Sequence, residues 1–371
     1  MIRVSEPFID QAENDAVADA MRRTALSGHM QDYIVKFEEG FSRYCDVGHG
    51  IATNNGTTSI HLIMAALGIK SGDEVLVSTY TNMATFFAVL YQGATPIPID
   101  IDPDTWNMNP ELLERAITPR TRAVLPVHIF GHPVDMDPVL EIARRHKLLV
   151  VEDAAQSHGA LYKGRKTGSL SDAASFSFYS NKVITTGEGG MVVTDNADIA
   201  ASCREYRNLC YGKGEDRFLH EDVGFNYRMS NLHAAIGWAQ VGKLEHNIAR
   251  KREIAGWYHD RLKDMPEFQL PIERGDVRNV FWMYHVVLTD AAKNDRRTVM
   301  GRMQKKGIET RPGFTPFNRQ KIARDRGMSS PDACPVANRI GERSFYVPSG
   351  VLLTEKEVDM VASALREAVR S

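Results

Sequence analysis

One lysine near the middle of the chain has surroundings that could make it a nucleophile. Lys182 follows the segment SFSFYSN, in which Phe176 and Phe178 alternate with polar residues as in a half-buried strand. It precedes the glycine-rich segment TTGEGG, and glycine permits backbone turns that are closed to other residues. A lysine held against apolar surface loses hydration, which favours the neutral amine over the ammonium ion. Such an amine could form a Schiff base with an aldehyde, whereas an ordinary solvated lysine is the alternative.

A second apolar segment ends in an acidic residue that could act together with this lysine. Residues 147–153 have the sequence KLLVVED, which is typical of a buried parallel strand that ends in two acids. Open α/β sheets bind ligands at the carboxyl ends of their strands. We therefore expect Asp153 to lie at a ligand crevice and Glu152 to face solvent.

A third segment could bind an anion. Residues 54–67, NNGTTSIHLIMAAL, place Gly56 and Thr57 at the start of an apolar helix. Free N–H groups at a helix start bind phosphate, although most such segments are only helix caps. Pyridoxal phosphate (PLP) requires an amine for its aldehyde, a carboxylate for its pyridine nitrogen and a phosphate cradle. Lys182, Asp153 and this helix start together predict a PLP site.

Four segments carry a resemblance to a known family. They are Asp153-Ala-Ala-Gln156, Ser177, the NKVITTGEGGM segment around Lys182, and residues 224–229, GFNYRM. These segments resemble the DegT/StrS-type sugar aminotransferases, a family of fold type I PLP enzymes. The resemblance covers nearly the whole chain and is most specific over residues 56–237. Within the family, the likeness is greatest to the branches of GDP-perosamine synthase and of the 8-amino-3,8-dideoxy-manno-octulosonate aminotransferase.

The expected fold is α/β. Apolar segments at residues 75–79, 96–99, 123–129 and 191–194 are predicted strands, and most of them are separated by helices, which favours a mainly parallel sheet with right-handed crossovers. A helical pattern extends from Ser230 to about Lys263. The resemblance implies a fold type I aminotransferase. We expect a large three-layer domain over residues 1–243 that binds PLP and a smaller α+β domain over residues 244–371.

The resemblance also implies roles for single residues. Lys182 is the catalytic residue, which would hold the cofactor and shuttle a proton. Asp153 would pair with the pyridine nitrogen, and Gln156 would contact the ring hydroxyl. The phosphate would be bound by Gly56, Thr57, Ser177 and, from the neighbouring subunit, Asn226. A shared site of this kind implies a homodimer, whereas a loop asparagine that closes a turn is the alternative for Asn226. Candidate substrate contacts are His158, Arg228 and Phe314.

Two segments depart from the family pattern. Asn82 occupies the position where the family usually stacks an aromatic side chain on the cofactor ring, and Tyr80 could take that role instead. The segment RPGFTPFN at residues 311–318 lacks the histidines that perosamine-type enzymes have near the sugar. These departures leave the sugar and its nucleotide open. Trp282 and Tyr284 are spaced as strand residues of the core.

The resemblance implies amino transfer from L-glutamate to a keto-sugar. The expected acceptor is the 4-keto carbon of a nucleotide-linked 6-deoxyhexose, and a keto-octulosonate is the main alternative. A PLP-dependent sugar dehydratase would have histidine at the position of Lys182. A PLP-binding regulator without turnover would be expected to carry an additional DNA-binding module, and none is found.

Composition excludes several other classes. The 371 residues include 45 basic and 47 acidic side chains, a net charge of −2 that does not support nucleic-acid binding. The four cysteines show no CxxC spacing, so we expect no metal site and free thiols in the reducing cytoplasm. The amino terminus has no apolar core of a signal peptide, and no segment approaches the roughly 20 apolar residues that span a bilayer. We therefore expect a cytoplasmic enzyme without a membrane anchor.

Overall fold

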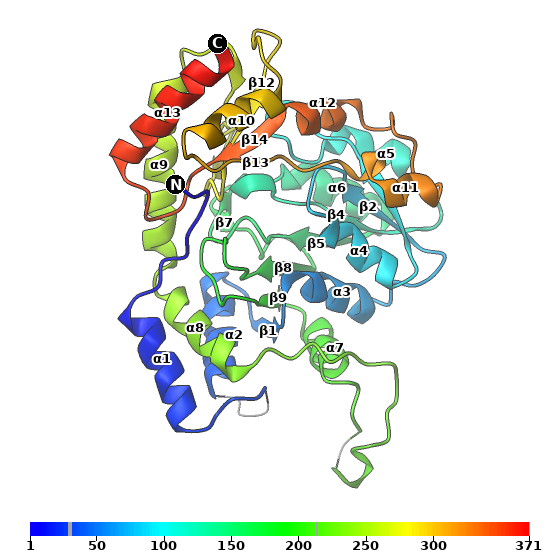
Figure 1. The fold of residues 1–371 in the computed structure, drawn as a ribbon. Helices are drawn as coiled ribbons and strands as arrows, with labels where there is room; N and C mark the ends of the chain where they lie inside the picture. Colours follow the sequence, from blue (N-terminus) through cyan, green and yellow to red (C-terminus); the bar gives the residue numbers. More distant parts are fainter. Residues whose placement is uncertain (29–31, 213, 371) are drawn as a thin grey trace.

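The computed structural model describes residues 1–28, 32–212 and 214–370 and is built on a seven-stranded sheet (Figure 1). The strand order is β1-β9-β8-β5-β4-β2-β3, and only β9 runs antiparallel to its neighbours. The parallel strands therefore end at one edge of the sheet. The strands are β1 (His49–Thr53), β2 (Glu74–Ser78), β3 (Thr95–Ile99), β4 (Thr121–Leu125), β5 (Leu149–Asp153), β8 (Ala173–Ser177) and β9 (Gly190–Thr194).

Helices cover both faces of this sheet and make it the middle of three layers. One face packs against α3 (Gly56–Ala66), α4 (Met83–Tyr91) and α7 (Ala197–Arg207). The other face packs against α2 (Asp32–Tyr44), α6 (Met136–His146) and α8 (Asn231–Val241). Because both faces are covered, β2 and β9 are buried along their whole length. The first helix, α1 (Gln11–Arg22), packs against α8, and α5 (Leu113–Ala116) is a single turn.

A second, antiparallel sheet forms after residue 243. Its order is β10 (Phe268–Gln269), β12 (Tyr284–Leu288), β14 (Ser344–Val347) and β13 (Arg311–Pro312). A separate apolar core joins this sheet to α9 (Leu244–Leu262), α10 (Arg296–Lys305) and α13 (Glu355–Arg370). Two further helices are α11 (Lys321–Asp325) and α12 (Pro335–Arg343), and a small sheet consists of β11 (Val277–Arg278), β6 (Leu161–Tyr162) and β7 (Arg165–Lys166).

The predicted architecture of a mainly parallel sheet with a smaller α+β part is confirmed, with local corrections. The helix expected over residues 230–263 is two helices, α8 and α9, because the chain breaks at Gly242 and Lys243. The strand expected to reach Ile129 ends at Leu125, and Phe130 has a left-handed φ of 52° in the turn that follows. The domain boundary expected at residue 243 falls in the break before α9 and stays a prediction.

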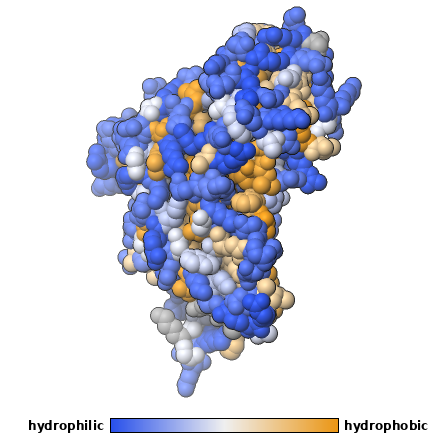
Figure 2. Space-filling view, turned by 90° about the vertical axis from the view of Figure 1, so that its left-hand side faces the viewer, coloured by the Kyte–Doolittle hydropathy of each residue, from blue (hydrophilic) through white to orange (hydrophobic). Residues whose placement is uncertain are grey.

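The surface on the side of α1, α9 and α13 is mainly hydrophilic. Figure 2 shows apolar side chains on this side gathered in a band across its middle. In the part of the chain that the structure describes, no helix has the length and apolar character that would span a membrane.

Candidate active site

Residues from three strand ends meet in one cavity. Asp153 ends β5, Ser177 ends β8, and Gly56 begins α3 just after β1. These strands are parallel and close in the sheet order, so their carboxyl ends lie together. The cavity has a volume of about 350 Å³ and is called the Lys182 cavity below. Its lining includes Asn55, Gly56, Thr57, Asn82, Thr85, Asp153, Gln156, Ser177, Tyr179, Asn181, Lys182, Trp282, Arg311, Phe314 and Tyr346.

Asp153 is a buried carboxylate held by two donors. The hydroxyl of Thr85 donates to its Oδ2 at 2.7 Å, and the backbone N–H of Ala155 donates to its Oδ1 at 3.1 Å. Burial raises the pKa of Asp153 above its usual value, and the two hydrogen bonds oppose that shift. A cationic group in the cavity would relieve the cost of burying this charge.

Lys182 is half-buried, and its side chain lies against an aromatic ring. Its Nζ is 3.9 Å from the centroid of the Trp282 indole. Burial lowers the pKa of Lys182 to about 8, although the charge of Asp153 acts in the opposite direction. A lysine with this pKa is partly a neutral amine in mildly alkaline solution, and only the neutral form is nucleophilic.

A hydrogen-bonded loop between β8 and β9, residues 178–189, contains this lysine. The Lys182 N–H donates to the carbonyl of Tyr179 at 2.9 Å. The N–H of Thr186 donates to the Phe178 carbonyl, and the Phe178 N–H donates to the Gly189 carbonyl. Gly187 has a φ of +80°, which favours glycine. The loop therefore has a defined shape, and Lys182 occupies a fixed place in it.

The start of α3 also lines the cavity. Asn55 caps this helix, and its side chain accepts a hydrogen bond from the Thr58 N–H. A Cβ at Gly56 would lie 2.8 Å from the Cβ of Ser177, so this contact requires glycine. The first N–H groups of α3 have no partner within the helix and form, with the Thr57 and Ser177 hydroxyls, a set of donors for an anion.

Comparisons with known proteins agree with this geometry. Residues 7–366 match the DegT/DnrJ/EryC1/StrS aminotransferase family. The chain belongs to this family. It is 43% identical to the GDP-perosamine synthase of Caulobacter vibrioides over 99% of this chain and 98% of that protein. It is 36% identical to the GDP-perosamine synthase of Escherichia coli O157:H7 over 99% of this chain and 98% of that protein. The solved structure of DesV from S. venezuelae has a TM-score of 0.90 and 32% identity, with 99% of both chains covered.

DegT/DnrJ/EryC1/StrS enzymes are PLP-dependent aminotransferases, and the Lys182 cavity fits this cofactor. When bound, PLP supplies an electron sink for the carbon that gains or loses the amine. Lys182 would hold its aldehyde, Asp153 its ring nitrogen, and the start of α3 with Ser177 its phosphate. The Gln156 oxygen accepts the Phe130 N–H at 2.7 Å, which leaves the amide nitrogen as the donor toward a ligand.

Three residues lie elsewhere than the sequence predicted. Glu152 is not solvated: it is fully buried and accepts hydrogen bonds from the N–H groups of Gly168 and Leu170. His158 does not reach the Lys182 cavity. It is enclosed by the rings of Phe41, Phe176 and Phe178, and burial lowers its pKa to about 3. Arg228 does not line the cavity of its own subunit either, and its guanidinium donates to the Asn208 side chain at 2.6 Å. Asn226 is exposed and does not line the cavity of its own subunit, so its predicted contact with the phosphate of a neighbouring subunit stays a prediction.

The aromatic side chains of the cavity were not all predicted. Tyr80 cannot replace the missing stacking residue, because it is fully buried and its hydroxyl binds His285 and Ser344. Asn82 lines the cavity as the cap of α4. Trp282, which was expected to be a core residue only, also contacts Lys182. Thr85, Arg311 and Tyr346 were missed, since no local pattern marks them, whereas the predicted contact Phe314 does line the cavity.

Proposed function

We propose that this enzyme transfers the amino group of L-glutamate to the 4-keto carbon of a nucleotide-linked 6-deoxyhexose, and that the nucleotide is GDP. The supporting observation is a single cavity that contains Lys182, Asp153 and the start of α3, in a chain similar over nearly its whole length to GDP-perosamine synthases. The overall exchange converts glutamate and the keto-sugar into a 2-oxo acid and an amino-sugar, and it consumes no other reactant.

Three residues of the cavity would have different roles in this reaction. Lys182 would hold the aldehyde of the cofactor, and its Nζ, once freed by an amine substrate, would move a proton between the reacting carbons. Asp153 would pair with the protonated ring nitrogen, and that positive charge would relieve the cost of burying the carboxylate, the same cost that raises the pKa of Asp153. Arg311 lines the same cavity and pairs with Glu309 at 3.1 Å. We infer that its guanidinium binds an anionic group of a substrate, because glutamate and a nucleotide sugar both carry such groups.

The test is a two-stage spectroscopic experiment with a panel of acceptors. We expect glutamate to change the absorbance of the bound cofactor, and a GDP-linked 4-keto-6-deoxyhexose to restore it. The same sugar on dTDP or UDP tests the nucleotide, and a keto-octulosonate tests the main alternative acceptor. Release of a deoxygenated sugar would indicate a dehydratase, and no response to glutamate would indicate a regulator. Restoration by the keto-octulosonate alone would refute the proposed substrate.

We also propose that the enzyme is a homodimer with shared active sites. The segment between α7 and α8 extends from the body of the molecule (Figure 1) and exposes three large apolar side chains. Phe218, Leu219 and Val223 are 80%, 66% and 79% exposed. Apolar groups on an extended segment are typical of a subunit contact. Asn226, at the end of this segment, would then complete the phosphate site of the partner.

Subunit mixing tests this arrangement. Lys182→Ala and Asn226→Asp each damage a different half of a shared site, and we expect both parent proteins to be impaired. A hybrid dimer would have one intact site, so random mixing should restore about a quarter of wild-type activity. If Asn226 acts within its own subunit, mixing gives only the average of the two parents. Light scattering provides the subunit count, and a monomer would refute the proposal.

The cytoplasm is the proposed location. All four cysteines are buried free thiols, which is the usual state in a reducing compartment. The proposed substrates, glutamate and a nucleotide sugar, are soluble and charged, which agrees with that location.

A further inference from the structure

Helix α9 contacts the surroundings of Lys182 at two positions one turn apart. The side-chain amide of Asn247 donates to the carbonyl of Val183 at 2.9 Å. Four residues later, the Nζ of Lys251 donates to the carbonyls of Trp282 and Ser349, both at 2.8 Å. Positions four apart lie on the same face of a helix. One face of α9 is therefore bonded both to the loop that contains Lys182 and to the segment that contains Trp282.

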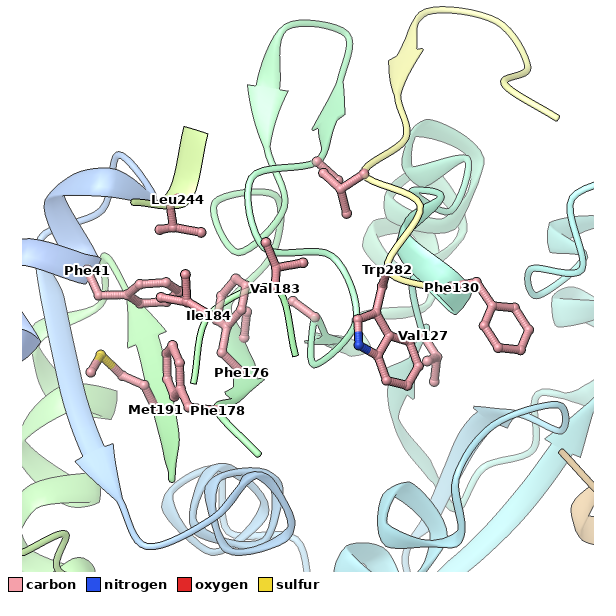
Figure 3. Close-up of a cluster of buried hydrophobic side chains, with 14 of the residues drawn as sticks. Phe41, Val127, Phe130, Phe176, Phe178, Val183, Ile184, Met191, Leu244 and Trp282 are labelled. Atoms are coloured by element: carbon pink, nitrogen blue, oxygen red, sulfur yellow. The ribbon is translucent and has the colours of Figure 1, made fainter. Parts of the chain in front are cut away.

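Trp282 is fixed at three points. Its backbone N–H donates to the Phe130 carbonyl at 2.8 Å, and its indole Nε1 donates to the Asn181 carbonyl at 2.7 Å. Its own carbonyl accepts the hydrogen bond from Lys251. Figure 3 shows the indole between Val183 and Phe130. The carbonyls on both sides of Lys182 are therefore both bonded to donors connected with α9. Asn247 of α9 bonds the Val183 carbonyl directly, and the Trp282 indole, whose backbone is bonded by Lys251 of α9, bonds the Asn181 carbonyl.

We propose that Lys251 is a positioning residue that holds the Trp282 ring against the Nζ of Lys182 and thereby sets how basic the catalytic amine is. This inference rests on the proposed role of Lys182. The ring excludes water from one side of Nζ, and loss of hydration is the main cause of the lowered pKa of Lys182. A ring that moved away would admit water to that side of Nζ and raise the basicity of the amine.

The surroundings of Lys251 indicate that it acts as a hydrogen-bond donor and that its positive charge is not required. Its side chain is 3% exposed, and within the described part of the chain both of its hydrogen bonds go to carbonyls and none to a carboxylate. Burial lowers the pKa of Lys251 to about 7. The neutral amine keeps two N–H donors, so both bonds persist when the charge is lost. An apolar residue of the same length would leave two buried carbonyls without a partner.

The test measures the reactivity of Lys182 in the protein without cofactor. Acetylation by a limiting pulse of acetic anhydride is followed by peptide mass spectrometry across a range of pH. The charged or titratable groups that act on Lys182 are Asp153 and His158. For the wild-type protein we expect an inflection at about pH 8. In Lys251→Met we expect it to rise by at least about one unit toward the ordinary lysine value of about 10.4.

Arg250→Met is the matched control. Arg250 is also a cation of α9 that donates to backbone carbonyls, those of Val351 and Leu353, but it does not bond Trp282. We expect its Lys182 inflection to equal that of the wild type. Lys251→Gln, which keeps a donor without a charge, is the second variant and should fall between wild type and Lys251→Met. An unchanged inflection in folded Lys251→Met overturns the proposal.

Reductive trapping distinguishes this inference from the proposed function. Borohydride treatment of the protein with PLP bound should label the peptide that contains Lys182. A label on another lysine would refute the role of Lys182 itself. A label on Lys182 together with an unchanged inflection in the Lys251 variants would refute only the positioning role of Lys251.

Discussion

Replacing Lys182 with alanine is expected to reduce kcat by at least about 10⁴-fold, because both the covalent attachment of the cofactor and the proton shuttle are lost. The fold should be retained. Lys182 is half-buried, and its backbone N–H bond to the Tyr179 carbonyl does not involve the side chain. Steady-state rates with glutamate and the acceptor sugar provide the measurement.

Two comparisons make this result specific. Lys163→Ala removes a surface lysine that pairs with Asp137, and it should leave the rate unchanged. A small primary amine added to the Lys182→Ala enzyme should restore part of the rate, since it can enter the space of the missing side chain and transfer the proton. Sustained multiple turnover by Lys182→Ala without an added amine would contradict the assignment.

The residues that sequence could predict are those whose position follows from local structure. Asp153 ends β5, Gly56 and Lys182 lie in the segments that follow β1 and β8, and the ends of parallel strands meet at one edge of a sheet. The same rule brings Ser177 to the cavity. Their convergence was therefore predictable once the strands and their parallel order were recognised.

Contacts between distant segments were not predictable in this way. Trp282 lies against Lys182 because its backbone bonds Phe130 and its indole bonds Asn181, which is 101 residues away in sequence. No periodicity encodes such a contact. Glu152 was wrongly expected at the surface because two adjacent acids at a strand end suggest one solvated member. The fully buried His128 side chain and backbone N–H groups nearby bind it instead.

Helix breaks and buried polar groups also depended on tertiary structure. Residues 242 and 243 separate α8 from α9, although nothing stronger than one glycine marks the break in sequence. His158 follows the DAAQ segment closely and could have faced the ligand. It turns instead into the aromatic cluster of Phe41, Phe176 and Phe178, shown in part in Figure 3. The direction of a side chain beyond a strand end is set by the packing around it.

Asp153→Asn is expected to reduce kcat by about 10²- to 10³-fold, the effect of breaking a buried charge pair by removing one partner. Asparagine preserves the size of the side chain and can still bond the Thr85 hydroxyl, but it cannot balance a positive ring nitrogen. Steady-state kinetics with glutamate in excess measure this loss. Asp153→Glu keeps the charge but displaces it, and Thr85→Val keeps the charge while removing a donor, so both should lose less activity than Asp153→Asn.

The same substitution should have the opposite effect on the stability of the protein without cofactor. Burial raises the pKa of Asp153, so the folded state binds the proton more tightly than the unfolded state does. The stability that this group contributes is therefore present at low pH and is lost as the pH rises through its folded pKa. At neutral pH the neutral asparagine avoids that cost, and thermal unfolding should show an equal or higher Tm for Asp153→Asn. A buried charge that serves only function lowers the stability of the protein, so removing it should raise stability and reduce activity. An Asp153→Asn protein that is less stable and equally active would therefore contradict the assignment of Asp153 to the cofactor.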